Sequence, residues 1–256
     1  MGEAMLVAVL AKSLAQPAAI SVSDISSSRL DYLKKQYAVA VTPDNIKNVS
    51  GKDVIVLAVK PQKLAELMTE LKDKIKSDQL VLSIIAGAKI ETISKGLNHS
   101  AVVRAMPNTP AQVGEGISVW AASPAVSKEQ KQATRAIIGA MGRELYVDDE
   151  GYLDMATAVS GSGPAYFFLM VEALVEAAVE VGLPPDRAQE IVVQTMLGSA
   201  KFIQQSGENP AELRKKVTSP GGTTAAALAQ FEEGDFIELV KRAVQAAYER
   251  AKELGK

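Results

Sequence analysis

Four short segments place glycine, serine, threonine or proline beside apolar runs, in patterns that suit ligand binding. They are AVKP (58–61), AMPNTP (105–110), SGSGPAY (160–166) and TSPGGTT (218–224). The first two follow apolar runs that we expect to be strands, and open α/β sheets bind ligands beyond the carboxyl ends of their strands. The last precedes a predicted helix, so its glycines can present backbone N–H groups to a carboxylate or a phosphate.

Each segment taken singly also fits an ordinary structural role. AVKP is typical of a strand that ends at a helix-starting proline, SPGG of a turn before a helix, and SGSG of a linker between domains. The four segments together, in this order, favour a site for a small molecule or a cofactor.

The composition excludes several classes of protein. The 256 residues carry 28 basic and 30 acidic side chains, a net charge of −2 that argues against a nucleic-acid partner. Cysteine is absent, and His99 is the only histidine, so disulfides, thiol nucleophiles and multi-histidine metal centres are excluded and no metal is expected. Aromatic residues make up 5%, too few for a platform that stacks single-stranded bases.

The sequence contains two long apolar segments, and neither predicts targeting to a membrane. Residues 4–11 are apolar, but Glu3 replaces the positive region of a signal peptide and Lys12 follows at once. Residues 165–181 are too short and carry too many glutamates to span a bilayer. We expect no membrane partner and a cytoplasmic location.

From residue 1 to about 150, short β-branched runs alternate with helical patterns, which predicts a parallel sheet with crossover helices. Residues 54–59 (VIVLAV) are continuously apolar, as in a strand buried on both faces. Ser127 and Gln130 have the spacing of a capping box. The expected strands are 20–23, 54–59, 80–86, 102–106, 117–121 and 145–147, and the expected helices are 2–14, 27–36, 62–75, 90–97 and 127–141.

After residue 150 the strand pattern stops, and helices are expected over 165–181, 184–206, 210–217, 223–233 and 236–254. The first of these is apolar around most of its circumference, apart from one stripe of glutamates. A domain of about 100 residues offers such a helix little cover, so we expect the same region of a second subunit to bury it.

The four segments, with LSIIAG (82–87), LGSAK (197–201) and the lengthened forms RAMPNTP, AVSGSGPAY and VTSPGGTT, closely resemble the pyrroline-5-carboxylate reductases. The resemblance runs from residue 2 nearly to the C-terminus. It implies a Rossmann-like α/β domain over residues 1–150 and an all-α domain over 151–256 that forms a homodimer, with assembly to a decamer in some members. The implied activity is reduction of 1-pyrroline-5-carboxylate to L-proline, the last step of proline biosynthesis, with NADPH or NADH as the hydride donor.

The resemblance also implies two sets of site residues. Those expected to bind the cofactor are Gly2, Ser23, Asn45, Ala58, Val59, Lys60, Pro61, Ala86, Gly87, Pro107, Asn108 and Thr109. Those expected to bind the substrate are Ser160, Ser162, Ser219, Gly221, Gly222, Thr223 and Thr224.

Reducing a cyclic imine needs a hydride on carbon and a proton on nitrogen. Because the imine is basic, it arrives protonated or takes its proton from a hydroxyl or water, and no strong general base is required. We expect the protein mainly to orient the reactants. Thr224 is the predicted hydrogen-bond donor to the ring nitrogen.

Three further residues admit simple interpretations. His99 lies in a polar GLNHS stretch and is expected to be a solvated loop residue. Lys60 either meets a phosphate or starts the next helix. Trp120 lies in a predicted strand and is expected to pack rather than to bind.

The N-terminus departs from the family pattern of a strand followed by G-x-G-x-x-G. The chain opens with MGEAM, so Gly2 corresponds to the third glycine, and the first strand and two glycines are missing. That strand lies in the middle of the family's sheet, so we expect a gap with exposed apolar neighbours. Two explanations are open, a chain cut from a longer protein, which we favour, or a chain that binds dinucleotide poorly.

Cofactor preference and function each have alternatives. Arg29 and the serines around it suit a 2′-phosphate, whereas Asp24 would repel one and could hold ribose hydroxyls. We favour NADPH. The competing functions are a related 3-hydroxyacid-type dehydrogenase and a non-catalytic dimeric assembly or sensing protein, and nucleotide affinity separates the last from the two enzymes.

Overall fold

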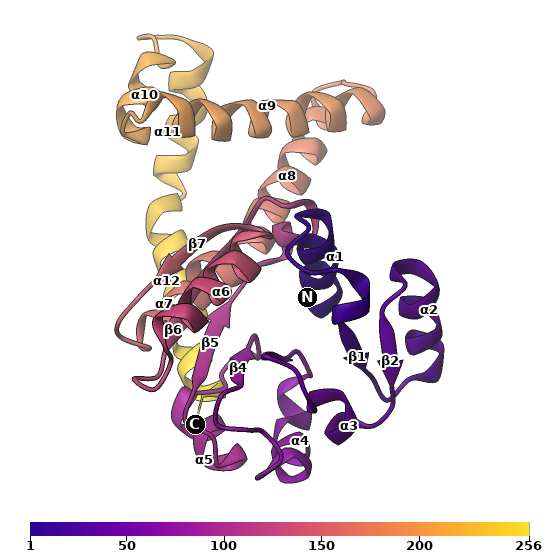
Figure 1. Ribbon diagram of the computed structural model, residues 1–256. Helices are drawn as coiled ribbons and strands as arrows, with labels where there is room; N and C mark the ends of the chain where they lie inside the picture. Colours follow the sequence, from indigo (N-terminus) through magenta and orange to yellow (C-terminus); the bar gives the residue numbers. More distant parts are fainter. Residues whose placement is uncertain (256) are drawn as a thin grey trace. The chain divides into compact units, whose positions relative to one another are not determined.

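Strands and helices alternate through the first 146 residues, and only helices follow in the described part of the chain (Figure 1). The structure, a computed structural model, describes residues 1–255. The strands are β1 (Ser21–Ser23), β2 (Ala40–Thr42), β3 (Val54–Leu57), β4 (Leu80–Ser83), β5 (Val102–Met106), β6 (Gly116–Ala122) and β7 (Gly142–Tyr146). The helices among them are α1 (Gly2–Ala11), α2 (Ser27–Tyr37), α3 (Asn45–Val49), α4 (Leu64–Leu71), α5 (Ile90–Leu97) and α6 (Lys128–Gly139).

The strands form two sheets, β1–β2 and β3–β4–β5–β6–β7. The expected parallel pairing holds for every pair of neighbours except β5 and β6, which run antiparallel. The reason is the short connection between these two strands, which holds only a five-residue 3₁₀ helix. A parallel crossover needs a dozen or more residues.

Several helices begin at side-chain caps that the sequence carries. Ser127 and Gln130 form the expected capping box at the start of α6. Ser26 accepts a hydrogen bond from the backbone of Arg29 at the start of α2, and Asp44 caps α3 in the same way. The strand β2 and the helix α3 were not predicted, because three and five residues are too short to show a period.

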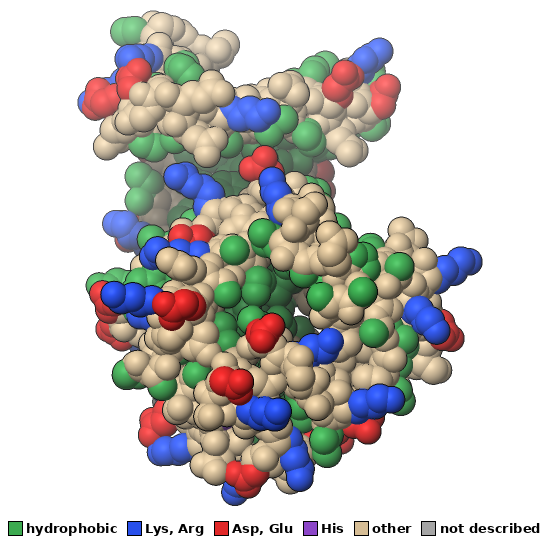
Figure 2. All heavy atoms as spheres, in the orientation of Figure 1, with side chains coloured by type: hydrophobic (Ala, Val, Ile, Leu, Met, Phe, Trp, Pro, Cys, Tyr) green, Lys and Arg blue, Asp and Glu red, His purple; other side chains and the backbone are tan. Residues whose placement is uncertain are grey.

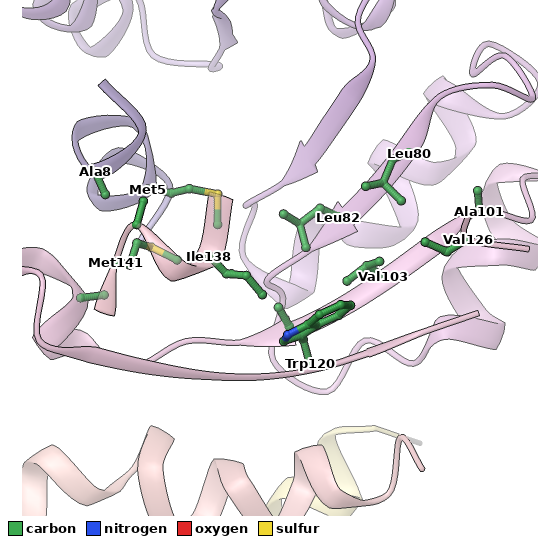
Figure 3. Close-up of a cluster of buried hydrophobic side chains, with 13 residues drawn as sticks. Met5, Ala8, Leu80, Leu82, Ala101, Val103, Trp120, Val126, Ile138 and Met141 are labelled. Atoms are coloured by element: carbon green, nitrogen blue, oxygen red, sulfur yellow. The ribbon is translucent and has the colours of Figure 1, made fainter. Parts of the chain in front are cut away.

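The larger sheet is covered by apolar side chains on both faces. One cluster joins α1 and α6 to the sheet around Trp120, and Figure 3 shows Met5 and Ala8 of α1 on the same side as Ile138 and Met141. The other cluster joins α4 and α5 to the opposite face. Trp120 is fully buried, as predicted, and its indole N–H donates to Glu144 at 2.5 Å.

His99 corrects a prediction. It is buried, with its Nε2 2.9 Å from the backbone oxygen of Gln79, and is not solvated. The neighbouring polar letters suggested a surface loop, but Asn98 takes a left-handed conformation that ends α5 and turns the chain back into the core.

The helix α1 links the two sheets. Met5 and Ala8 pack in the cluster of the five-stranded sheet, whereas Leu6 packs with Leu33 and Val39 of the two-stranded part. The edge of β1 opposite β2 and the edge of β3 opposite β4 have no strand partner among residues 1–255. The sequence predicts a gap in the sheet with exposed apolar neighbours, and Val56 of β3 is 39% exposed.

The chain divides into two units, one of residues 1–162 with 247–256 and one of residues 163–246. The first unit therefore includes the last turns of α12 (Phe236–Leu254). Their end lies against Gly87, where an added Cβ would come within 2.6 Å of the backbone oxygen of Leu254. Gly87 also has φ +76°, so this contact requires glycine.

The second unit is helical in its described residues, with α8 (Gly163–Glu180), α9 (Pro185–Ser206), α10 (Pro210–Lys216), α11 (Thr223–Glu233) and most of α12. Large apolar side chains of α8 are exposed, Phe167 by 60% and Phe168 by 65%. The continuous helical run Tyr152–Glu180 has the length and apolarity of a membrane span, a test that core helices of soluble proteins and signal sequences also pass.

Candidate functional site: loops along one sheet edge

Two of the four predicted segments, AVKP and AMPNTP, lie at the ends of strands of the first unit. Because β3, β4 and β5 are parallel neighbours, their carboxyl ends lie along one edge of the sheet. The strands end at Leu57, Ser83 and Met106, earlier than the expected ends for the first two. The loops that start there contain seven of the residues expected to bind the cofactor, at Ala58, Val59, Lys60, Ala86, Gly87, Pro107 and Asn108, and Pro61 and Thr109 begin the 3₁₀ turns that follow.

A side-chain hydrogen bond and a close approach of Gly2 relate the N-terminal part of the chain to β3. Lys52, just before β3, donates from its ammonium to the backbone oxygen of Ala19, just before β1, at 3.4 Å. The segment before β1 therefore lies beside the segment before β3. Gly2, the first residue of α1, lies at the carboxyl end of β3, since a Cβ on it would be 3.1 Å from the Cβ of Ala58.

Asn108 has a structural contact that the sequence did not reveal. Its Oδ1 accepts a hydrogen bond from the backbone N–H of Ile117 at 3.0 Å and thereby fixes the loop after β5. The adjacent Pro107 is buried. The side-chain amide nitrogen of Asn108 is left for a ligand, so the same residue can hold the loop and contact a bound molecule.

Asn45 and Ser23 are each held by a neighbour. The Asn45 amide donates to Glu70 at 2.8 Å, and the Ser23 hydroxyl accepts from the amide of Asn48 at 3.2 Å. Lys60 is exposed in the loop before Pro61. Their placement agrees with a site along this edge, and their roles in binding stay predictions.

Glu3 at the start of α1 forms an ionic cluster with side chains of α2. Glu3 accepts hydrogen bonds from the Tyr37 hydroxyl at 2.7 Å and from the Arg29 guanidinium. The hydrogen bond from Tyr37, and after it the bond from Arg29, hold the pKa of Glu3 below its ordinary value. The bond to Glu3 also raises the pKa of Tyr37. Asp24 in turn accepts from the backbone N–H of Ser26 at 2.9 Å.

The SGSG segment begins in a turn of π-helix, Thr157–Gly161, directly after α7 (Tyr152–Ala156), and continues into the start of α8. Ser160 donates its hydroxyl to the backbone oxygen of Ala156 at 2.9 Å. A Cβ on Gly161 would lie 3.0 Å from the terminal methyl of Met106, so this turn packs against the end of β5. The structure therefore brings the SGSG and AMPNTP segments together. Short π-helical turns are frequent at functional sites.

An ion cluster beneath these two segments was missed from the sequence. Arg104 of β5 is buried, and its guanidinium donates to Glu150 at 3.0 Å and to Asp154 of α7 at 2.8 Å. Glu150 Oε1 also accepts from the backbone N–H of Ile90, the first residue of α5. The available indication was an arginine inside an otherwise apolar strand, because a buried charge requires a partner.

The TSPGGTT segment belongs to the second unit and forms the turn before α11. Gly221 has φ +69°, and a Cβ on Gly222 would come within 2.5 Å of the Ser219 hydroxyl. Gly222 is the N-cap of α11 and has no side chain to bond the first backbone N–H groups. Those groups and the hydroxyls of Thr223 and Thr224 are therefore available to an anion.

Comparison with known proteins decides the family. The model of the pyrroline-5-carboxylate reductase dimerisation domain matches residues 150–254, and a model described as NADP oxidoreductase, coenzyme F420-dependent, matches residues 1–87. The pyrroline-5-carboxylate reductase of Synechocystis is 44% identical over 256 residues, covering 100% of this chain and 95% of the relative. That of Pseudomonas aeruginosa is 40% identical over 241 residues, covering 93% and 88%. The chain belongs to the pyrroline-5-carboxylate reductase family.

Solved structures of pyrroline-5-carboxylate reductases agree with the whole chain. The Coxiella burnetii enzyme superposes with a TM-score of 0.92 at 39% identity, covering 100% of this chain and 95% of that one. The Plasmodium falciparum enzyme, solved with NADP bound, gives 0.90 at 30% identity with the same coverage. The predicted Rossmann-like domain and helical dimerisation domain of this pyrroline-5-carboxylate reductase family member are thereby confirmed.

Proposed function

We propose that this chain reduces 1-pyrroline-5-carboxylate to L-proline with a hydride from NADPH, the final step of proline biosynthesis. Full-length relatives at 40–44% identity carry this enzyme's name. The observation that carries the proposal is the single sheet edge along which the loops after β3, β4 and β5 meet. That edge is where dinucleotides bind in open α/β sheets.

The residues of this edge fit a dinucleotide. Ala58 and Gly2 are small residues in close contact, which lets backbone approach a ligand. The proposed cofactor contacts are the twelve residues expected from the sequence, among them Lys60 for a phosphate and Asn108 for the nicotinamide end. When bound, NADPH supplies the hydride. NADH is the alternative donor, and the ratio of kcat/KM with the two cofactors tests the preference for NADPH.

The proposed substrate contacts are Ser160, Ser162 and the turn from Ser219 to Thr224. The uncapped N-terminus of α11 supplies backbone N–H groups for the substrate carboxylate. The Thr224 hydroxyl makes no hydrogen bond within residues 1–255 and is partly exposed, so it is available as donor to the ring nitrogen. Catalysis then rests on orientation, since the imine needs no strong base.

Kinetics of Thr224 variants test this role. Thr224→Ala should lower kcat by about tenfold or more, which corresponds to the loss of about 1.4 kcal/mol of transition-state stabilisation, while NADPH affinity stays unchanged. Thr224→Ser keeps the hydroxyl and should retain most of the activity. An unchanged kcat in Thr224→Ala would refute the role of the hydroxyl. An inactive parent chain that still binds NADPH would refute the proposed reaction itself.

The assembly we propose is a homodimer through the helical unit, with a decamer as a possible further state. It is supported by the match to the dimerisation model and by the exposed phenylalanines of α8. Light scattering of the purified chain distinguishes one, two and ten copies. A cytoplasmic location, which we also propose, is tested by cell fractionation.

A further inference from the structure

Arg104 is a buried charged residue to which the proposed reduction gives no direct role. Figure 2 shows that most lysine and arginine side chains in view project from the surface, whereas only 3% of the Arg104 side chain is exposed. Its guanidinium donates to Glu150 at 3.0 Å and to Asp154 at 2.8 Å. We call these three side chains the Arg104 cluster.

The backbone of Arg104 is a fixed point in the fold. The strand β5 pairs with β4 on one side and with β6 on the other, with Ser83 and Ala121 opposite Arg104. Two residues after Arg104 the strand ends, and the loop with Pro107 and Asn108 begins. A group bonded to the guanidinium therefore keeps a set position relative to that loop.

Asp154 connects the Arg104 cluster to the π-helical turn Thr157–Gly161. Asp154 lies in α7, which continues directly into that turn. The turn carries Ser160, and it is closed by the backbone N–H of Ser162, which donates to the backbone oxygen of Thr157 at 2.8 Å. The ion pair at Asp154 therefore helps to fix where Ser160 and Ser162 lie relative to the loop after β5.

Glu150 connects the Arg104 cluster to the loop after β4. Its Oε1 accepts from the Arg104 guanidinium and also, at 2.9 Å, from the backbone N–H of Ile90, the first residue of α5. The N-cap residue of that helix makes no side-chain hydrogen bond to it, so Glu150 supplies the cap from a position 60 residues away in the sequence. The Arg104 cluster therefore holds the far end of the loop of residues 84–89, which carries two of the residues expected to bind the cofactor.

Stability alone does not require charges at this place. A buried ion pair adds little net stability over well-packed apolar side chains of similar volume, because both charges lose their hydration. Apolar packing is also present already, since Leu153 of α7 is fully buried in a cluster with Val119 and Ala121 of β6. Apolar contacts are non-directional, whereas hydrogen bonds between charged groups fix the relative position of the groups that they join.

We infer that the Arg104 cluster positions the reactants of the proposed reduction. Arg104 with Asp154 sets Ser160 and Ser162 against the loop after β5, and Arg104 with Glu150 sets the cofactor loop after β4. All three act through other residues and are positioning residues, and the inference rests on the proposed function. Misplacing a reacting group by about 1 Å can lower a rate about 100-fold, so a shift of either segment should be visible in the kinetics.

Asp154→Ala tests the substrate side. It removes the bond to α7 and leaves the bond between Arg104 and Glu150, so kcat at saturating NADPH should fall at least about fivefold, while the Kd for NADPH stays within about twofold of the parent chain. Asp154→Asn keeps an acceptor oxygen for the guanidinium and should lose less activity than the alanine variant.

Glu150→Ala tests the cofactor side. It leaves the first N–H of α5 without its acceptor, so the Kd for NADPH, measured by calorimetric titration, should rise at least about threefold, while kcat at saturating NADPH stays within about twofold. Glu150→Gln keeps an acceptor for the N–H of Ile90 and should bind NADPH within about twofold of the parent chain.

Two further variants separate positioning from stability. Ile138→Val shortens a fully buried side chain whose cluster includes Val103 and Ala105, the neighbours of Arg104 that point to the other face of the sheet. It should lower the melting temperature by a few degrees and leave kcat and the NADPH Kd unchanged. Arg104→Met with Asp154→Leu should regain part of the melting temperature lost in Arg104→Met, but its kcat should stay at least about fivefold below that of the parent chain.

Amide hydrogen exchange supplies a measurement that needs no turnover. Followed by mass spectrometry on the peptide that covers residues 157–162, exchange should be at least about threefold faster in Asp154→Ala than in the parent chain, and it should be unchanged in Ile138→Val.

Two results would overturn the inference. One is that kcat and the NADPH Kd follow the melting temperature in all variants, Ile138→Val included, and the other is that Asp154→Ala changes neither kcat nor the exchange of that peptide. A parent chain without reductase activity would instead refute the proposed function. In that case the exchange rates and the NADPH affinities still decide whether the Arg104 cluster holds the two segments.

Discussion

Replacing Arg104 by methionine is the change with the largest predicted effect on the first unit. The Arg104 side chain is 3% exposed and bonds two carboxylates, of which Glu150 is 27% and Asp154 13% exposed. Methionine fills much of the volume but supplies no charge. The two carboxylates then lie close together without a partner, in a region that water reaches poorly.

The expected cost follows from that burial. Breaking a buried ion pair by removing one partner costs about 3–5 kcal/mol. Partial exposure of Glu150 lets water stabilise one of the two carboxylates, so we expect a value near the lower limit, about 3 kcal/mol. With a urea m-value of about 2 kcal/mol/M, the midpoint of unfolding falls by about 1.5 M.

Urea unfolding of the full chain at one fixed protein concentration measures this shift, because assembly makes stability depend on concentration. The matched control is Arg135→Met, whose side chain is 57% exposed and lies 3.7 Å from Glu144. It should cost less than about 1 kcal/mol. A second variant, Arg104→Met with Asp154→Leu, removes the more buried of the two unpaired carboxylates and should recover part of the loss. Equal midpoints for Arg104→Met and Arg135→Met would refute the reasoning.

Three further predictions concern the backbone, the pH dependence and the assembly. Gly142→Ala should destabilise the chain by more than about 2 kcal/mol, because φ is +137° and the added Cβ would lie 2.1 Å from a carbonyl oxygen of β6. Gly139→Ala is the control, since a Cβ at this position of α6 would meet no atom within 4 Å, and thermal melts compare the two variants. The hydrogen bond from Tyr37 lowers the pKa of Glu3 in the folded chain. The ionised Glu3 therefore stabilises the fold above its ordinary pKa of 4.5, and this stabilisation is lost as the pH falls through the lower folded pKa. In Glu3→Gln, urea midpoints measured between pH 7 and pH 3 should no longer show this loss. Phe168→Glu on the exposed face of α8 should give a smaller species by light scattering, and an unchanged mass would place the interface elsewhere.

The alternation of apolar runs was enough to predict the order of elements and most helices of the second unit. Strong periodicity and caps explain this success, as at α6, where Ser127 and Gln130 fix the start. The antiparallel step at β6 could not be predicted from alternation, because it depends on the length of a connection and not on the strand pattern. The prediction that His99 is solvated was wrong for a similar reason, since its burial depends on a tertiary hydrogen bond to the backbone oxygen of Gln79.

The sequence predicted the segments of the candidate site but not how they lie relative to one another. The sequence placed the residues after strand ends, and the structure adds that three of those ends share one edge. Contacts between distant residues, such as Gly161 with Met106 or Arg104 with Asp154, have no local pattern and required the fold. Only the position of Arg104 within an apolar strand gave an indication before the structure.

The return of α12 to the first unit has a consequence for the timing of folding during synthesis. Residues 163–246 lie between the two parts of that unit, and 84 residues at about 5–20 per second take about 4–17 s to translate. During this interval Gly87 and the loop after β4 lack the turn of helix that covers them in the finished protein. The first unit is therefore incomplete during this interval. If translation stalled before residue 247, that loop would stay exposed to chaperones and proteases.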